Sequence, residues 1–318
     1  MTRALVFIVL ALTAGFAVAD WPEKPLHVIV PYVGGAMGDV VARLVAEDLR
    51  RALGQPLVID NRPGAGGNIG TAAVAQAAPD GYTVLVAATN NFVINQYLYR
   101  GMGFDPREAL APVTILVDVP SVIFTGAKVP ARTMAEFIQY ARDNKGRLNY
   151  ASPGAGTTPH LSAALINATR GMGMSHVPYK GASQAITALL ANEVQMYLVG
   201  AGLGAAQVQA GRLRALAVSS DKRLESLSDT PTFEEAGLSD IKASNWWGVA
   251  VPKGTRPEIV RKLSDSMRNT LDSEGFRKSA VKLGVVPVGG TPEETARRWR
   301  EEADYWSKAV KDMSVKID

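Results

Sequence analysis

The 318-residue sequence contains no cysteine and only three histidines. Without cysteine the chain can form no disulfide, no thiolate metal site and no cysteine nucleophile, and it cannot carry the lipidated cysteine of a bacterial lipoprotein. The histidines, His27, His160 and His176, show neither H-x-H nor H-E-x-x-H spacing, so no metal site is predicted. A chain of this kind must depend on a hydrophobic core for its stability.

A strong excess of charge is also missing. Lysine and arginine number 34 against 30 acidic residues, which gives a net charge of +4. No basic run of the kind that nucleic-acid-binding proteins carry is present, so we expect no nucleic-acid partner. Beyond the N-terminus no apolar stretch approaches the roughly 20 residues that a spanning helix needs, so the mature protein is not expected to be inserted in a membrane.

Residues 1–19 have the pattern of a secretory signal peptide. Arg3 precedes an apolar run from Ala4 to Val18, and Ala17-Val18-Ala19 is a cleavage site of the A-x-A kind. The alternative is an uncleaved membrane anchor, for which the apolar run is too short. We therefore predict cleavage after Ala19 and export of the mature chain.

Strand and helix patterns alternate along the rest of the chain, which predicts an α/β protein. Two domains are expected, each a mostly parallel sheet flanked by helices. The long apolar segments 111–128 and 245–252 contain few helix signals, and we interpret them as two strands crossing between the domains. This assigns residues 20–118 and 246–318 to domain I and residues 119–245 to domain II.

Two strand-to-helix junctions carry glycine-rich turns, one at residues 32–38 and one at residues 152–158. Thr158 and Pro159 are predicted as N-cap and first residue of the helix after the second turn. Such turns expose unpaired N–H groups at the positive end of a helix dipole, which suits an anion. Ligands of α/β sheets bind beyond the carboxyl ends of the strands. We expect two ends of one small acid to be held from opposite sides.

Motifs for catalysis or cofactor binding are weak. Gly181-Ala182-Ser183-Gln184-Ala185 approaches the G-x-S-x-G elbow of hydrolases, but no histidine follows it as that arrangement requires. Other triad orders stay possible in principle. Residues 64–70 give G-x-G-x-x-x-G, one residue longer than the dinucleotide fingerprint, and the acid expected about 20 residues later is missing. That loop is better interpreted as a tight, closely packed turn, and we expect neither catalytic residues nor a cofactor.

Several long motifs follow one another along the chain. They are NRPGAGGNIG (61–70), APDGY (78–82), LNYASPG (148–154), HVPYKG (176–181) and AGRLRALA (210–217). In this order they resemble the solute receptors of tripartite tricarboxylate transporters, also called the Bug family of periplasmic binding proteins. The resemblance covers residues 21–311 and implies a two-domain periplasmic-binding-protein fold of type II.

The resemblance also implies a small carboxylate ligand between the domains. Carried over by position, the residues expected at its first end are Tyr32, Gly34, Gly35, Ala36, Gly38, Thr89, Asn90 and Asn91. Those expected at its second end are Ser152, Gly154, Ala155, Gly156, Thr157, Thr158, His160, Tyr179, Lys180, Val199 and Gly200. For His160 a role as a helix-start residue without ligand contact is equally open.

The chain departs from the family pattern at two of these positions. Gly38 stands where a threonine or serine is usual, so a hydroxyl donor is lost. Val199 stands where an acid is common, which removes an acceptor for a ligand ammonium group. We therefore expect a carboxylate without an α-amino group, apolar or aromatic in its middle.

Together these features predict a monomeric periplasmic solute-binding protein. It would deliver a dicarboxylate or an aromatic acid to the membrane subunits of a tripartite tricarboxylate-type transporter. Two alternatives stay open: a periplasmic enzyme acting on a small carboxylic acid, and a ligand sensor for a signalling system. The lack of a recognisable nucleophile–base pair in the sequence argues against the enzyme.

Overall fold

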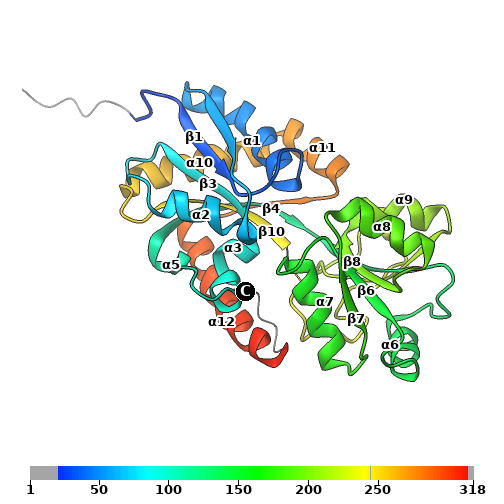
Figure 1. The fold of residues 1–318 in the computed structure, drawn as a ribbon. Coiled ribbons are helices and arrows are strands. Elements are labelled where there is room, and N and C mark those ends of the chain that lie inside the picture. Colours follow the sequence, from blue (N-terminus) through cyan, green and yellow to red (C-terminus); the bar gives the residue numbers. More distant parts are fainter. Residues whose placement is uncertain (1–20, 244, 314–318) are drawn as a thin grey trace, which may run out of the picture.

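The computed structural model describes residues 21–243 and 245–313. These residues form two lobes, each built on its own β-sheet (Figure 1). The predicted signal peptide, residues 1–19, lies outside the described residues, and its cleavage stays a prediction. Among the residues described, no helix is both long and apolar enough to cross a membrane.

The first lobe contains a six-stranded sheet of order β11-β4-β10-β3-β1-β2. Its strands are β1 (Leu26–Val30), β2 (Leu57–Asn61), β3 (Thr83–Ala88), β4 (Leu110–Val119), β10 (Asn245–Pro252) and β11 (Val286–Gly289). Its helices are α1 (Met37–Leu53), the 3-10 helix η1 (Ala65–Gly67), α2 (Asn68–Ala75), α3 (Thr89–Val93), α4 (Asn95–Leu98), α5 (Pro106–Ala109), α10 (Pro257–Asp272), α11 (Glu274–Leu283) and α12 (Pro292–Met313). Strands from both ends of the chain thus complete one sheet.

The second lobe contains a five-stranded sheet of order β7-β6-β8-β5-β9. Its strands are β5 (Ser121–Gly126), β6 (Asn149–Ser152), β7 (Ser175–Pro178), β8 (Met196–Gly200) and β9 (Leu213–Val218). Its helices are α6 (Met134–Asp143), α7 (Thr158–Thr169), α8 (Ala182–Ala191), α9 (Ala201–Gln209) and the 3-10 helix η2 (Glu225–Leu227). All of these elements come from one continuous stretch of the chain.

Helix α1 shows how the sequence specifies these elements. Val41, Val45 and Leu49 recur at helical spacing and are buried against the sheet of the first lobe. The helix ends at Gly54, whose φ of 69° is the left-handed conformation that glycine adopts without steric penalty. Both signals, the apolar stripe and the glycine stop, can be identified in the sequence alone, and they predict this helix and its end.

The predicted α/β fold with two helix-flanked sheets is confirmed, but both sheets are mixed rather than mostly parallel. Strands β1, β2 and β3 are parallel, as are β6, β7 and β8, whereas β4, β5, β9, β10 and β11 make antiparallel pairs. The chain leaves the first lobe along β4 and returns along β10. Because the chain leaves along one of these neighbouring strands and returns along the other, the two strands run in opposite directions.

The two lobe connections differ from the predicted pair of crossing strands. Segment 111–128 divides at Pro120 into β4 of the first sheet and β5 of the second. Proline lacks the N–H that a continuous ladder needs, which accounts for the break. Strand β10 lies wholly in the first sheet, and the return connection precedes Asn245. The domain limits at residues 119 and 245 stay a prediction.

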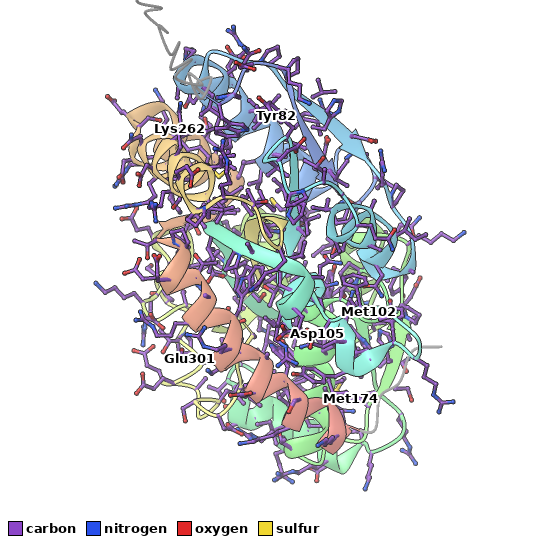
Figure 2. All side chains as sticks on the ribbon, turned by 90° about the vertical axis from the view of Figure 1, so that its left-hand side faces the viewer. Tyr82, Met102, Asp105, Met174, Lys262 and Glu301 are labelled. Carbon is purple, nitrogen blue, oxygen red and sulfur yellow. The ribbon has the colours of Figure 1, made fainter. Side chains whose placement is uncertain are left out.

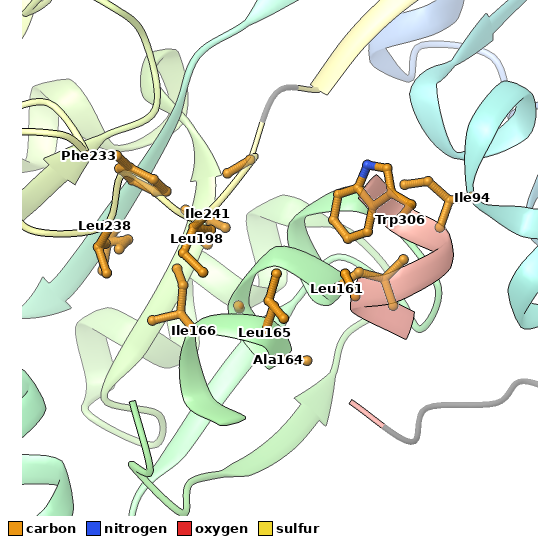
Figure 3. Packing of buried hydrophobic residues seen from close by; sticks show 14 of the residues in the cluster. Ile94, Leu161, Ala164, Leu165, Ile166, Leu198, Phe233, Leu238, Ile241 and Trp306 are labelled. Carbon is orange, nitrogen blue, oxygen red and sulfur yellow. The ribbon is translucent and has the colours of Figure 1, made fainter. Parts of the chain in front are cut away.

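The last helix joins the lobes through a hydrophobic cluster. Trp306 of α12 is almost completely buried and lies with Ile94 opposite Leu161 of α7, in the second lobe (Figure 3). The lobes also meet at Gly202 of α9, where the backbone lies close to the end of α11. A Cβ added at Gly202 would lie only 3.1 Å from the carbonyl oxygen of Leu283. The second lobe is therefore packed on two helices of the first.

Four side chains tie α12 to both lobe connections, and we call them the α12 network: Asp118, Trp246, Arg298 and Glu302. Arg298 Nε donates to Glu302 Oε1 at 2.7 Å, and its Nη2 lies 3.0 Å from Asp118 Oδ2. Trp246 Nε1 donates to Glu302 Oε2 at 2.8 Å. Burial raises the pKa of Glu302, while its bonds to Arg298 and Trp246 oppose that shift. Since Asp118 and Trp246 lie beside the two connections, α12 holds the base of both.

Candidate functional site

The predicted site residues follow the carboxyl ends of parallel strands in both lobes. One group follows β1 and β3, and the other follows β6 and β8. Helices α3 and α7 lie on the sides of their lobes that face one another (Figure 1). This is the strand edge at which α/β proteins bind ligands.

In the first lobe, two asparagines connect Tyr32 to the glycine turn at residues 64–67. The Tyr32 hydroxyl lies 3.1 Å from Asn90 Oδ1 and 2.7 Å from Asn91 Oδ1. Both asparagine amides in turn donate to the Gly66 carbonyl, at 3.1 and 3.0 Å. These side chains are therefore engaged within the protein. Burial raises the pKa of Tyr32, so its hydroxyl is a neutral donor.

The glycine turn at residues 64–67 is a packing device. Gly67 has a φ of 92°, and a Cβ there would lie 2.3 Å from Asn91 Nδ2. A Cβ at Gly66 would lie 2.3 Å from the Tyr99 hydroxyl oxygen. This close approach supports the interpretation as a packed turn and explains the glycines without a dinucleotide.

The carboxylate of Asp39 binds one N–H group of the first loop and a neighbouring arginine. Asp39 Oδ2 accepts from the Gly35 N–H at 2.9 Å and from Arg43 Nε at 3.0 Å. The bond to Arg43 lowers the pKa of Asp39 to about 2, so this carboxylate is ionised at neutral pH. The Gly35 N–H is thus occupied.

The start of α1 has free N–H groups. Its N-cap is Ala36, which provides no side-chain cap. In the described part of the chain, the N–H groups of Met37 and Gly38 have no protein acceptor. They point out of the positive end of a 17-residue helix, where a negative charge is stabilised.

In the second lobe, Thr157 and not Thr158 caps α7, so that prediction is wrong by one residue. Thr157 Oγ1 accepts from the His160 N–H at 3.4 Å and donates to the Gly154 carbonyl at 2.8 Å. Pro159 follows in the first turn, where its missing N–H is harmless. Thr158 Oγ1 is buried and finds no hydrogen-bond partner among the residues described, and such a group is a candidate for contact with a ligand or a water.

Two stacked histidines hold the second loop. The rings of His160 and His176 are 3.9 Å apart at 26°. His160 Nδ1 accepts from the Gly156 N–H at 3.1 Å, which leaves the imidazole proton on Nε2. His176 Nε2 lies 2.7 Å from Ser152 Oγ, which also accepts from the Gly154 N–H at 3.2 Å. The N–H groups of Gly154 and Gly156 are therefore satisfied within the loop region, while those of Ala155, Thr157 and Thr158 have no acceptor in the described part of the chain.

Burial lowers the pKa of both histidines to about 4, and for His160 the neighbouring His176 contributes. Both rings are neutral at pH 7 and the site contains no imidazolium. Sequence reasoning did not choose His176 as a site residue, although the HVPYKG motif contains it. The missing signal was spatial: β7 pairs with β6, which sets His176 beside Tyr150.

The contact between Ser152 and His176 is a nucleophile–base pair in distance, which corrects the expectation that none exists. Ser152 is fully buried, and its Oγ also serves the Gly154 N–H. Within residues 21–243 and 245–313, His176 has no carboxylate partner to orient it. The pair therefore shapes the loop and lacks the exposed nucleophile that acyl transfer needs.

The other predicted residues differ in accessibility. Thr89 Oγ1 donates to the Trp246 carbonyl and accepts from the Trp246 N–H, at 3.0 and 2.8 Å, so this hydroxyl anchors β10. Val199 packs in the buried core of the second lobe. Tyr179 is half-buried, and Lys180 is exposed next to it. Gly200 is half-buried at the end of β8.

The structure contains a cavity outside the predicted site and no candidate metal site within the described residues. A surface cavity of about 590 Å³ is lined by parts of α10, α11 and β11, on the first lobe. No group of three or more His, Asp or Glu side chains in the described ranges is placed to hold a metal ion. The chemistry available at the site itself is hydrogen-bond donation from backbone, hydroxyl and neutral ring groups, together with the exposed ammonium group of Lys180.

Comparison with known proteins identifies relatives over almost the whole chain. Residues 41–315 match the family model described as tripartite tricarboxylate transporter family receptor. Protein BugT of Bordetella pertussis is 33% identical over 323 residues, covering 100% of this chain and 99% of that protein. The structure of Rpa4515 of R. palustris with adipate has a TM-score of 0.83 and 33% identity, covering 93% of this chain and 99% of the other. MatC of Rhodopseudomonas palustris with bound malate has a TM-score of 0.80 and 29% identity, covering 91% and 100%.

Proposed function

This chain belongs to the tripartite tricarboxylate transporter family of receptors, and on that premise we propose that it binds a small dicarboxylate or aromatic acid between its two lobes and delivers it to the membrane subunits of such a transporter. The family is one of non-enzymatic periplasmic binding proteins. The observation that carries the proposal is the likeness, over more than nine-tenths of the chain, to two structures that hold the dicarboxylates adipate and malate. Export to the periplasm through a signal peptide belongs to the same proposal.

The proposed first subsite is the start of α1. There the N–H groups of Met37 and Gly38 would receive one carboxylate, next to the loop of Gly34, Gly35 and Ala36 and the ring of Tyr32. Thr89, Asn90 and Asn91 would shape this subsite, because their side chains are tied to other parts of the protein.

The proposed second subsite is the start of α7. The free N–H groups of Ala155, Thr157 and Thr158 and the unpartnered Thr158 hydroxyl would receive the other end of the ligand. His160 would add its Nε2–H, since its Nδ1 is occupied by the Gly156 N–H. The remaining predicted residues, Ser152, Gly154, Tyr179, Lys180, Val199 and Gly200, would form its surroundings.

The energetics favour a ligand that reaches both subsites. Hydrogen bonds to a charged group contribute about 1.5–3 kcal/mol each, whereas association costs on the order of 4–15 kcal/mol. Micromolar affinity corresponds to about −8 kcal/mol, which one subsite alone would hardly supply. Binding and closure of the lobes are therefore coupled in this proposal.

The charge distribution at the site disfavours an amino acid. Asp39 is the carboxylate of the first loop, and it is already paired with Arg43 and the Gly35 N–H. Val199 occupies the position where an acid is common in the family, and it lies in the apolar core of the second lobe. A ligand ammonium group would lose water without gaining an acceptor.

Calorimetry on the mature protein tests the proposal, with adipate, malate, benzoate and glutamate as ligands. We expect binding of at least one diacid or aromatic acid and none of glutamate. Mass spectrometry of the ligand that co-purifies with the natively expressed protein provides an independent identification. Tight binding of glutamate, together with no binding of the other three acids, would contradict the proposal.

A variant of the second loop tests the location of the site. Gly156→Asp adds a negative charge where a carboxylate is proposed to bind, and the juxtaposition of two like charges costs several kcal/mol. We expect affinity to fall by about 100-fold or more. Gly146→Asp is the matched control, because Gly146 has nearly the same φ (78° against 77°) and open space around it. Equal affinity in the two folded variants would remove the second loop from the site.

A further inference from the structure

Gly38 and Trp247 are in contact at the start of α1, although 208 residues separate them in the sequence. Resting on the proposed function, we propose that these two residues form a pair that sets the specificity of the first carboxylate subsite. Trp247 fills the space of a side chain at position 38, so that the ligand meets an indole ring where a polar side chain would otherwise stand. The pair thereby selects acids without a hydroxyl group next to this carboxylate.

The contact is too close for any side chain at position 38. A Cβ added to Gly38 would lie 2.2 Å from Trp247 Cζ3, 2.8 Å from Cη2 and 2.9 Å from Cε3. All three atoms belong to the six-membered ring of the indole. Carbon atoms in contact stay about 3.5–4.0 Å apart, so Trp247 and a side chain at position 38 exclude one another.

Backbone conformation does not require glycine at this position. Gly38 is the second residue of α1 and has a helical conformation, which residues with a side chain also adopt. Glycine is about 1 kcal/mol less favourable than alanine within a helix. A residue that weakens the helix and is not needed for φ is here explained by the ring that lies on it.

The indole is held firmly in place. Trp247 is 5% exposed, and its ring packs edge-on against Tyr32 with centroids 5.1 Å apart. In the sheet, Trp247 lies opposite Ala88, the last residue of β3, at the edge that carries the site. Its Nε1 has no hydrogen-bond partner among the described residues, so burial and the contact with Tyr32 hold the ring rather than a hydrogen bond. The ring therefore cannot turn aside cheaply to admit a side chain at position 38.

The consequence for a ligand follows from polarity. A carboxylate at the free N–H groups of Met37 and Gly38 has its adjacent carbon atom near the bared helix start and the aromatic pair of Tyr32 and Trp247. A methylene or ring carbon fits such a surface, while a hydroxyl there would lose water without a partner. An apolar site rejects an added hydroxyl only moderately, by about 100-fold or less, so the expected preference is modest.

Two pairs of acids that differ by one hydroxyl test this inference by calorimetry: succinate with malate, and adipate with 2-hydroxyadipate. The proteins are the wild type, Gly38→Ser, Trp247→Phe and the double variant. Phenylalanine lacks the second ring that makes the contact, so the double variant has room for the serine. Gly204→Ser is the matched control, because a Cβ there would lie 2.3 Å from Phe124 Cζ, in the core of the second lobe.

We expect the wild type to bind the unsubstituted acid of at least one pair about tenfold more tightly than the hydroxylated one. Gly38→Ser should lower the unfolding temperature and weaken both acids. The double variant should regain stability relative to Gly38→Ser and shift the preference toward the hydroxylated acid by about tenfold, the value of one good hydrogen bond. Gly204→Ser should lose stability with an unchanged preference.

Two results would overturn the inference. One is the same preference in the wild type and the double variant, and the other is a Gly38→Ser protein as stable and as tight-binding as the wild type. Binding of neither pair by the wild type would instead count against diacids as the ligand class. The stability measurements need no ligand, so they separate failure of the contact from failure of the proposed function.

Discussion

Removal of the Glu302 carboxylate is expected to destabilise the protein strongly. In the α12 network this group accepts from Arg298 Nε and from Trp246 Nε1, and the residue is 6% exposed. Glu302→Ala leaves the indole N–H without its acceptor and removes the carboxylate that Arg298 Nε binds. Breaking a buried ion pair by removing one partner typically costs about 3–5 kcal/mol.

The structure places the expected value at the lower end of that range. Arg298 retains Asp118 at 3.0 Å, and about a quarter of each of these two side chains is exposed to solvent. We expect a loss of about 3 kcal/mol in the free energy of unfolding. With roughly 2.1 cal/mol/K of unfolding entropy per residue, a chain of about 300 residues would lose about 5 °C in its melting temperature.

Urea denaturation at pH 7 and thermal melting, both followed by circular dichroism, measure this effect. Glu301→Ala is the control, because Glu301 is exposed on the same helix (Figure 2) and surface changes usually stay within about 0.5 kcal/mol. In that view α12 runs along the surface from the end that carries Lys262 toward the end that carries Met174. Equal stability of the two variants would refute the reasoning that the network holds the lobe connections.

Two more predictions concern the loops. The pKa of both His160 and His176 is lowered to about 4 from 6.5 in the folded protein. Below pH 6.5 the unfolded chain therefore binds protons that the folded protein does not, so the free energy of unfolding is highest above pH 6.5 and decreases as the pH falls toward 4. Discounted for partial solvent access, the two histidines together should account for a loss on the order of 3 kcal/mol in the free energy of unfolding as the pH falls. His160→Gln should therefore lose less of its urea midpoint between pH 7.5 and 4.5 than the wild type does, and an identical pH profile would contradict this. Gly67→Ala should lower the free energy of unfolding by more than about 2 kcal/mol, because Gly67 has a positive φ and an added Cβ would contact Asn91. Gly101→Ala is the control and should cost about 1 kcal/mol, because Gly101 has a similar φ of 75° but open space around it. Equal melting temperatures of the two variants would contradict the contact with Asn91.

Local signals predicted most of the elements. The stripe from Val41 to Leu49 and the stop at Gly54 are set by residues within one or two turns. At the start of α12, Thr291 and Glu294 form a capping box, in which the Thr291 N–H donates to Glu294 Oε2 at 2.8 Å and the Glu294 N–H donates to Thr291 Oγ1 at 3.2 Å. Strands β1 to β3 and β6 to β8 follow from apolar runs of the right length. These parts were predictable because periodicity and capping act over short stretches of chain.

Non-local pairing decided what the sequence did not show. The direction of β10 depends on its neighbours β3 and β4, and nothing within residues 245–252 encodes it. The reason for Gly38 lies in Trp247, and the role of His176 lies in its contacts with Ser152 and His160. The cap at Thr157 was missed by one residue because either threonine can accept from the first turn.

The central place of β10 has a consequence for the order in which the protein folds. β10 lies between β3 and β4, yet it is made only after the whole second lobe. Until it emerges from the ribosome, β3 and β4 each present an unpaired edge, which is a template for association with other chains. The second lobe, in contrast, comes from one continuous stretch, and its late core residues, Phe233, Leu238 and Ile241, are all made before β10. A nascent chain that stops short of Asn245 should therefore contain a folded second lobe beside a first sheet whose open edges, at β3 and β4, are prone to aggregation.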